Sequence, residues 1–167
     1  MIVRMAFLLG VISLGAGCGA AVAKASPEAD TSAKQFTAPS GAANVYVFRD
    51  ESFGGAVKMS VLLDGHPLGD TGPKCYLMTP VAPGPHQVTS KAEKDSTVDF
   101  TAQAGNSVYV WQEVKMGILS ARSSLKIVDE ATAQPRVCGC SLAVTQPQAP
   151  LPSAAQPTAS TSAVPGS

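Results

Sequence analysis

The sequence predicts an all-β protein built as one small β-sandwich. Short runs rich in β-branched and aromatic residues recur through the middle of the chain, and clusters of Gly, Pro, Asn and Asp separate them about every eight to twelve residues. No stretch of this region has the spacing of a convincing amphipathic helix. These patterns favour a sandwich, Ig-like or prealbumin-like, over a small barrel.

About seven strands are expected. The first, 44–50 (NVYVFRD), has apolar side chains on both faces, which indicates a strand in the centre of a sheet. The second, 56–64, places Val57, Met59 and Val61 on one face by its period of two. The other strands are expected at 75–81, 86–92, 96–102, 107–114 and 123–129, and the turns at 54–55, 64–70, 82–85, 94–95 and 104–106.

Residues 1–18 have the features of a secretory signal peptide. Arg4 precedes an apolar stretch of roughly a dozen residues, about 18 Å as a helix, too short for a hydrocarbon layer of about 30 Å. The stretch ends in LGAGC, which resembles a bacterial lipobox, so Cys18 is the expected acylated residue and mature N-terminus. The alternative is ordinary cleavage after Ala23 or Ala25, without lipid.

The composition divides the rest of the chain into three parts. Residues 19–42 are expected to be a flexible tether, and 43–140 a single sandwich domain. Residues 141–167 are expected to be a disordered tail rich in Pro, Ala and Ser. From 145 to 167 this tail has five prolines and no charged residue, too little apolar surface to offset the entropy of ordering.

Charge and motifs exclude several classes of function. The formal net charge is zero and Lys and Arg do not cluster, so nucleic acid is not an expected partner. The sequence has no G-x-S-x-G elbow, no H-E-x-x-H pair and no phosphate loop. We therefore assign no catalytic residue, no metal and no cofactor.

The stretch VLLDGHPLGD (61–70) allows two interpretations. Asp64 and His66 lie two residues apart, as an acid–imidazole pair would need, but no nucleophile with an oxyanion site is nearby. Asp-Gly after a strand is typical of a tight hairpin, because both residues accept positive φ. The hairpin is favoured, and the turn residues are assigned as Asp64, Gly65, Gly69, Pro83 and Gly84. A metal site that uses His66 and His86 is a weaker alternative.

The cysteines suggest a disulfide. Export permits one, and with Cys18 acylated the remaining cysteines are Cys75, Cys138 and Cys140. A bridge from Cys75 to Cys138 or Cys140 would close a loop of about 60 residues, worth about 3–4 kcal/mol on the chain-entropy model. Metal chelation or redox chemistry by the Cys-Gly-Cys segment remains an alternative, although a lone C-x-C lacks the second ligand pair of a closed zinc site.

Tyr109 and Trp111 fall on one face of the strand expected at 107–114. If this face is exposed, the two rings form a platform for a carbohydrate or a peptide. If it is buried, they belong to the sandwich core. Core packing is favoured.

The segment VLLDGHPLGD…YLMTPVAPGPHQV resembles a motif of bacterial envelope β-domains, in which a strand ends in Asp-Gly and a later strand follows Pro-Gly-x-His. The chain resembles an uncharacterised lipoprotein family that opens with a Val-Tyr-Val-Phe-Arg strand, here residues 45–49, and it is similar to PEGA-type β-domains. The resemblance covers residues 43–130 and departs from the PEGA pattern at 70–74. It implies a β-fold, no known catalytic site, and a turn or packing role for His86.

These observations predict an exported, non-enzymatic lipoprotein of the bacterial cell envelope. It would present a structural or binding module at the periplasmic face or the cell surface. Its expected partners are a membrane, through the lipid on Cys18, and other envelope proteins or the cell wall. The alternative is a periplasmic metal-binding or redox protein that uses Cys138 and Cys140.

Overall fold

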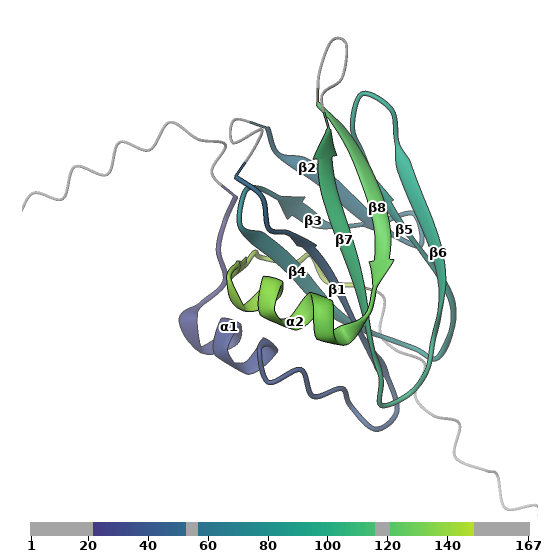
Figure 1. Cartoon of the computed structure of the whole chain (residues 1–167). Helices are drawn as coiled ribbons and strands as arrows, with labels where there is room; N and C mark the ends of the chain where they lie inside the picture. The colour runs from purple at the N-terminus through teal and green to yellow at the C-terminus, as the bar shows by residue number, and fades with distance from the viewer. Residues whose placement is uncertain (1–21, 53–56, 116–120, 149–167) are drawn as a thin grey trace, which may run out of the picture.

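The computed structural model describes residues 22–52, 57–115 and 121–148, and these fold into two stacked β-sheets with two helices on one side (Figure 1). One sheet has the strand order β8 (Arg122–Val128), β7 (Ser107–Lys115), β1 (Ala43–Arg49), β4 (Cys75–Val81) and β9 (Ser141–Leu142). The other has the order β3 (His66–Thr71), β2 (Met59–Leu63), β5 (Gly84–Ser90) and β6 (Ser96–Ala102). The predicted all-β sandwich is confirmed.

Strand β1 is the centre of the larger sheet, as its sequence predicted. It runs parallel to β7 and antiparallel to β4, and all seven of its residues are buried. Val45 and Val47 face the second sheet, whereas Tyr46 and Phe48 face the opposite side. The strand is apolar on both faces because both faces are covered.

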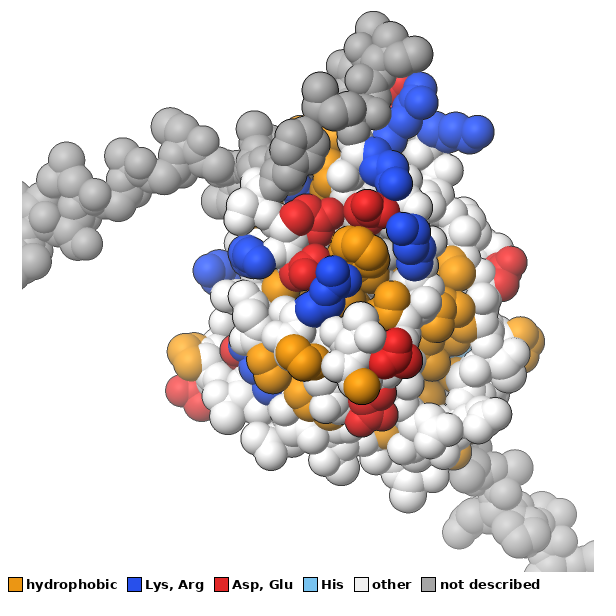
Figure 2. All heavy atoms as spheres, in the orientation of Figure 1, with side chains coloured by type: hydrophobic (Ala, Val, Ile, Leu, Met, Phe, Trp, Pro, Cys, Tyr) orange, Lys and Arg blue, Asp and Glu red, His pale blue; other side chains and the backbone are white. Residues whose placement is uncertain are grey.

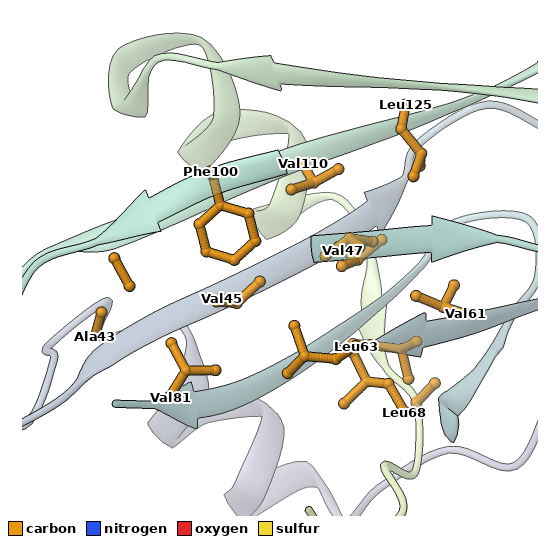
Figure 3. Close-up of a cluster of buried hydrophobic side chains, with 14 of the residues drawn as sticks. Ala43, Val45, Val47, Val61, Leu63, Leu68, Val81, Phe100, Val110 and Leu125 are labelled. Carbon is orange, nitrogen blue, oxygen red and sulfur yellow. The ribbon is translucent and has the colours of Figure 1, made fainter. Parts of the chain in front are cut away.

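The space between the sheets is filled mainly by aliphatic side chains (Figure 3). Val45 and Val47 from the larger sheet meet Val61 and Leu63 from the smaller one, and Phe100 of β6 packs in the same cluster. Burial at about 25 cal/mol per Å² of apolar surface makes this layer the main source of stability.

Two helices cover the outer face of the larger sheet. They are α1 (Pro27–Ala33) and α2 (Glu130–Cys138), and α2 crosses in front of the sheet in Figure 1. Three tyrosines of the sheet hold them. Tyr46 Oη donates to Ala33 O of α1 at 2.8 Å, Tyr76 Oη donates to Asp30 Oδ1 at 3.0 Å, and Gln134 Nε2 of α2 donates to Tyr109 Oη at 3.2 Å.

No helix was expected from the sequence, and this was wrong. The flexible tether expected at 19–42 was also wrong over the described residues 22–42, which contain α1. Ser26 caps α1 by accepting from Ala29 N at 3.2 Å, and Pro27 occupies the first turn. Asp129 caps α2 by accepting from Thr132 N at 2.9 Å. Both caps follow known start signals. The helices are so short that their stability depends on docking to the sheet.

The C-terminal boundary of the domain was also wrong. Residues 141–148 belong to the fold, with β9 pairing parallel to β4. The smaller sheet gains β3, because the expected long turn at 64–70 is a two-residue turn followed by a strand. The expected signal peptide, the turn at 54–55 and the tail beyond 148 lie outside the described residues. Within the described ranges, no helix is long and apolar enough to cross a bilayer.

Candidate functional site

The turn between β2 and β3 has the predicted geometry. Asp64 has φ 50° and Gly65 has φ 79°, so both central residues of the two-residue loop have positive φ. This is the backbone that matches the right-handed twist of the paired strands. The prediction of an Asp-Gly hairpin at this position is confirmed.

The carboxylate of Asp64 does not bind the imidazole of His66. Its Oδ2 lies 2.7 Å from Nδ1 of His86, and its Oδ1 accepts from the backbone N–H of Gln87 at 2.8 Å. His66 is exposed, and its Nδ1 lies 3.0 Å from the backbone oxygen of Asp64. Pairing of β2 with β5 brings His86 to the turn, 22 residues along the chain.

The imidazole of His86 is fully engaged. Its Nδ1 contacts the carboxylate of Asp64, its Nε2 lies 2.7 Å from the backbone oxygen of Ala82, and the ring stacks on Phe100 at 5.7 Å. Both partners can only accept hydrogen bonds, so the imidazolium form, with two N–H groups, satisfies both. Both ring nitrogens are therefore occupied by oxygen atoms of the fold. This geometry matches the turn-bonding role expected of His86.

A shallow hollow of about 450 Å³ lies beside this pair. Asp64 and His86 form one wall, and Asp99, Phe100 and Thr101 of β6 form the other. Gln87 Nε2 donates to Asp99 Oδ1 at 2.8 Å and ties the two strands together. Among the described residues, no group of three or more His, Cys, Asp or Glu side chains is placed to hold a metal ion.

The other assigned turn residues have different roles. Pro83 lies in the short link between β4 and β5, and Gly84 opens β5 with φ 138°. Gly69 is not in a turn but inside β3, next to the bulge that shifts the β2–β3 register. A Cβ at Gly69 would lie 2.8 Å from Leu77 Cδ2 and 3.0 Å from Val144 O. Gly69 therefore allows the C-terminal segment to approach β3 closely.

The aromatic pair of β7 is divided between core and surface. Tyr109 is buried, but under the helices on the outer face of the larger sheet and not in the predicted core between the sheets, and it stacks on Tyr46 at 5.1 Å between ring centroids. Trp111 is partly buried, with the guanidinium of Arg136 4.2 Å and the ammonium of Lys126 5.1 Å from its ring. Both distances are typical of cation–π contacts. Figure 2 shows hydrophobic side chains surrounded by both signs of charge on this face.

The predicted disulfide is absent, and Cys75, Cys138 and Cys140 are free thiols. Cys75 belongs to the cluster between the sheets, Cys140 belongs to the cluster under the helices, and Cys138 is exposed at the end of α2. The two buried thiols thus lie in different layers. Burial raises the pKa of Cys140 to about 12, with a further contribution from Asp50, so this thiol is protonated at neutral pH. A protonated, buried thiol is a poor nucleophile and a poor metal ligand.

One end of the sandwich interior is polar, which the sequence did not reveal. Gln112 accepts from Thr71 through Oε1 and donates from Nε2 to Ser90 Oγ at 2.6 Å, and Ser123 Oγ lies 2.8 Å from the same oxygen. Arg49 is buried beside them and donates to Val57 O at 2.8 Å. In the sequence, a single polar residue in a strand of alternating polar and apolar residues is read as a position that faces solvent. Here Thr71, Gln112, Ser90 and Ser123 form a buried hydrogen-bonded network.

The N-terminal segment completes the edge of the larger sheet. Lys24 forms a bridge with Ala143, Ala25 N donates to Leu142 O at 2.9 Å, and Val144 N donates to Ala23 O at 2.9 Å. Residues 22–25 thus extend the sheet beyond β9. Gln146 N donates to Leu68 O of β3 at 2.7 Å, so the C-terminal segment closes the same side of the sandwich. We call this side, formed by 22–25, 142–146 and the neighbouring part of β3, the terminal edge.

Asp30 connects this edge to α1. Its Oδ1 accepts from Leu142 N at 2.8 Å and from Tyr76 Oη, and its Oδ2 lies 2.7 Å from Lys34 Nζ. Lys34 Nζ also donates to Cys140 O at 2.7 Å. Burial by itself would raise the pKa of Asp30, but the hydrogen bonds from Lys34, Leu142 and Tyr76 outweigh burial and hold the pKa below its usual value.

Comparison with known proteins gives a family but no activity. A protein of Haemophilus influenzae, described as an uncharacterized protein, is 27% identical over 141 residues, which cover 83% of this chain and 83% of that protein. A family model described as a protein of unknown function, DUF2846, matches residues 39–124, from just before β1 to the first residues of β8. That match spans about half of the chain, and the chain therefore belongs to the DUF2846 family.

Proposed function

We propose that this protein is a lipid-anchored component of the bacterial cell envelope, acylated at Cys18, whose β-sandwich acts as a non-enzymatic binding or structural module. The lipobox-like LGAGC and the apolar stretch before it support export and acylation. The membrane is then the first partner. Other envelope proteins or the cell wall are the expected further partners.

The observation that carries this proposal is the backbone pairing made by residues 22–25. Residues 22–25 pair with 142–144 at the terminal edge. Ordinary cleavage after Ala23 would remove the carbonyl that accepts from Val144 N, and cleavage after Ala25 would remove the whole pairing segment. Each lost backbone hydrogen bond costs about 0.5–1.5 kcal/mol. Processing at Cys18 leaves the edge intact, so the geometry favours the acylated form over the alternative cleavage sites.

The chemistry of the candidate residues supports a role without catalysis. His86 uses both ring nitrogens within the fold. Cys140 is buried and protonated, and Cys75 is buried on the other side of the sheet. These positions favour a binding or structural role over a thiol-dependent metal or redox function of Cys138 and Cys140.

Acylation is tested by growing cells with radiolabelled palmitate and measuring the intact mass of the mature protein. We expect the wild type to incorporate label and to begin at an acylated Cys18, and the Cys18→Ala variant to lose the label. Cys138→Ser is the matched control, because it removes the exposed thiol of the fold and should keep the label. An unlabelled wild-type protein that begins at Lys24 or Ser26 would refute the proposal.

A further inference from the structure

We propose that the terminal edge faces the lipid headgroups of the membrane and that the β8 edge points away from it. This inference rests on the proposed acylation of Cys18. It assigns an orientation to the sandwich, and it identifies which sheet edge is available to partners.

The length of chain between the anchor and the fold is the first argument. Residue 22 already packs against the core between the sheets, and only residues 19–21 separate it from Cys18. Four residue steps, fully extended, span at most about 14 Å. An acyl chain on Cys18 therefore keeps Val22 within about that distance of the headgroups.

The width of the sheet is the second argument. The strand order places β8 at one edge and β9 at the other, with residues 22–25 beyond β9. Five strand spacings of about 4.8 Å make this distance about 24 Å. If the β8 edge lay on the membrane, Val22 would be about 24 Å above it, farther than the connecting residues can reach.

The surface of the terminal edge fits a headgroup layer. A hollow of about 310 Å³ opens there, lined by Val22, Val144, Lys58, Asp70 and Gln146, with Ala23 and Gly69. Val144 is 51% exposed beside it. The Lys58 ammonium lies 3.8 Å from the Asp70 carboxylate, and Lys24 is also exposed. The charge of Lys58 is balanced by Asp70, so the exposed Val144 and Lys24 are the groups that suit the boundary between acyl chains and anionic headgroups.

The test compares the two large hydrophobic side chains that are most exposed in the described part of the chain. Val144 is on the terminal edge, and Ile127, 49% exposed, is on β8. Each is replaced by Cys in the full-length acylated protein carrying Cys138→Ser, labelled with a fluorophore, and reconstituted into phosphatidylethanolamine–phosphatidylglycerol vesicles that contain headgroup spin-labelled lipid. We expect the spin label to quench most of the fluorescence at Val144→Cys and little at Ile127→Cys. Gln146→Cys is a second probe on the same edge.

Equal quenching at the two edges, or stronger quenching at Ile127→Cys, would overturn the orientation. The mass of the same preparation shows whether Cys18 is acylated. Equal quenching with an acylated Cys18 refutes the orientation alone, whereas a protein without the acyl group refutes the proposed function as well. A Gly-Ser linker of about 20 residues inserted before Val22, with a span of about 25 Å, should abolish the difference between the edges. A difference that survives this linker would show that the short connection does not set the orientation.

Discussion

The two faces of the five-stranded sheet are both buried, but by different chemistry. The inner face packs aliphatic side chains such as Val45, Val47 and Leu77 against the second sheet. The outer face packs aromatic rings, among them Tyr46 and Tyr76, under two short helices, and their hydroxyls bond to α1. Two sheets can pack through aliphatic side chains alone, because their backbone groups are already paired within each sheet. Short helices leave backbone N–H and C=O groups unpaired at their ends, so they need polar contacts to the sheet as well.

The difference has a consequence for stability. Truncation of an inner side chain removes apolar burial from both sheets and should lower the free energy of unfolding of the whole domain. Loss of an outer anchor should first loosen one helix, because fewer buried contacts hold it. The following predictions compare the two faces, from the largest expected effect to the smallest.

The largest effect is expected at Leu77 of β4, which is fully buried between the sheets. Leu77→Ala should lower the free energy of unfolding by about 2–5 kcal/mol, through lost transfer energy and a residual cavity. Urea denaturation followed by far-UV circular dichroism measures the change. Met78→Ala, at the partly buried neighbour on the outer face, is the matched control and should cost less. The reverse order would mean that the outer layer dominates stability.

Asp30→Ala is expected to cost about 1–3 kcal/mol, since it leaves the N–H of Leu142 and the ammonium of Lys34 without this acceptor. Hydrogen exchange should show faster exchange in α1 and at the terminal edge, with the strands of the smaller sheet unchanged. Glu28→Ala, at an exposed position in the first turn of the same helix, should change both measurements much less. Uniformly faster exchange in Asp30→Ala would contradict the separation of the two faces.

Alkaline pH should weaken the outer face. Burial, with the nearby Tyr109, raises the pKa of Tyr46 from 10.0 to about 12. The group is neutral in the fold and ionises more readily in the unfolded chain, so its stabilising contribution is complete below pH 10 and is lost as the pH rises toward 12. Unfolding free energies measured from pH 8 to pH 11 should therefore fall. The fall should be smaller in Tyr46→Phe; an equal fall would exclude Tyr46 as a source.

The smallest effects distinguish the two histidines. His86→Ala removes the contacts to Asp64 and Ala82 and should cost about 1 kcal/mol. His66→Ala should lie within about 0.5 kcal/mol of the wild type, because its side chain is exposed and bonds only within the turn. Thermal melts of the two variants measure the difference. A more destabilising His66→Ala would mean that the local pair, rather than the cross-strand one, supports the turn.

The parts of the fold that could be predicted depend on short-range patterns. The apolar character of β1 on both faces and the positive φ of Asp64 and Gly65 follow from residues adjacent in the chain. Ser26-Pro27 is a start signal from which helix α1 could have been recognised. The helix has too few apolar residues, however, for its sequence to differ from that of a linker.

The partners of the candidate residues could not be predicted in this way. Asp64 meets His86 because β2 pairs with β5, and the two residues are 22 positions apart. Cys75 faces the cluster between the sheets because of its place in the side-chain alternation of β4, whereas Cys140 lies between α2 and β9 and packs under the helices. The sequence of 75–81 does not indicate which face of the strand carries the thiol of Cys75, because the side chains on both faces are largely apolar.

The sequence alone therefore determined the strands other than β3 and β9, the tight turn and the all-β class, because local backbone preference and side-chain alternation specify them. The tertiary structure decided what the ends of the chain do. Residues 22–25 and 141–148 have the composition of linkers, yet they complete one edge of the sandwich. Backbone groups at the free edge of β4 pair with β9, and residues 22–25 then pair with 142–144. Such pairing depends on the position of the free sheet edge in the folded protein, which cannot be inferred from the amino-acid composition of the paired segments.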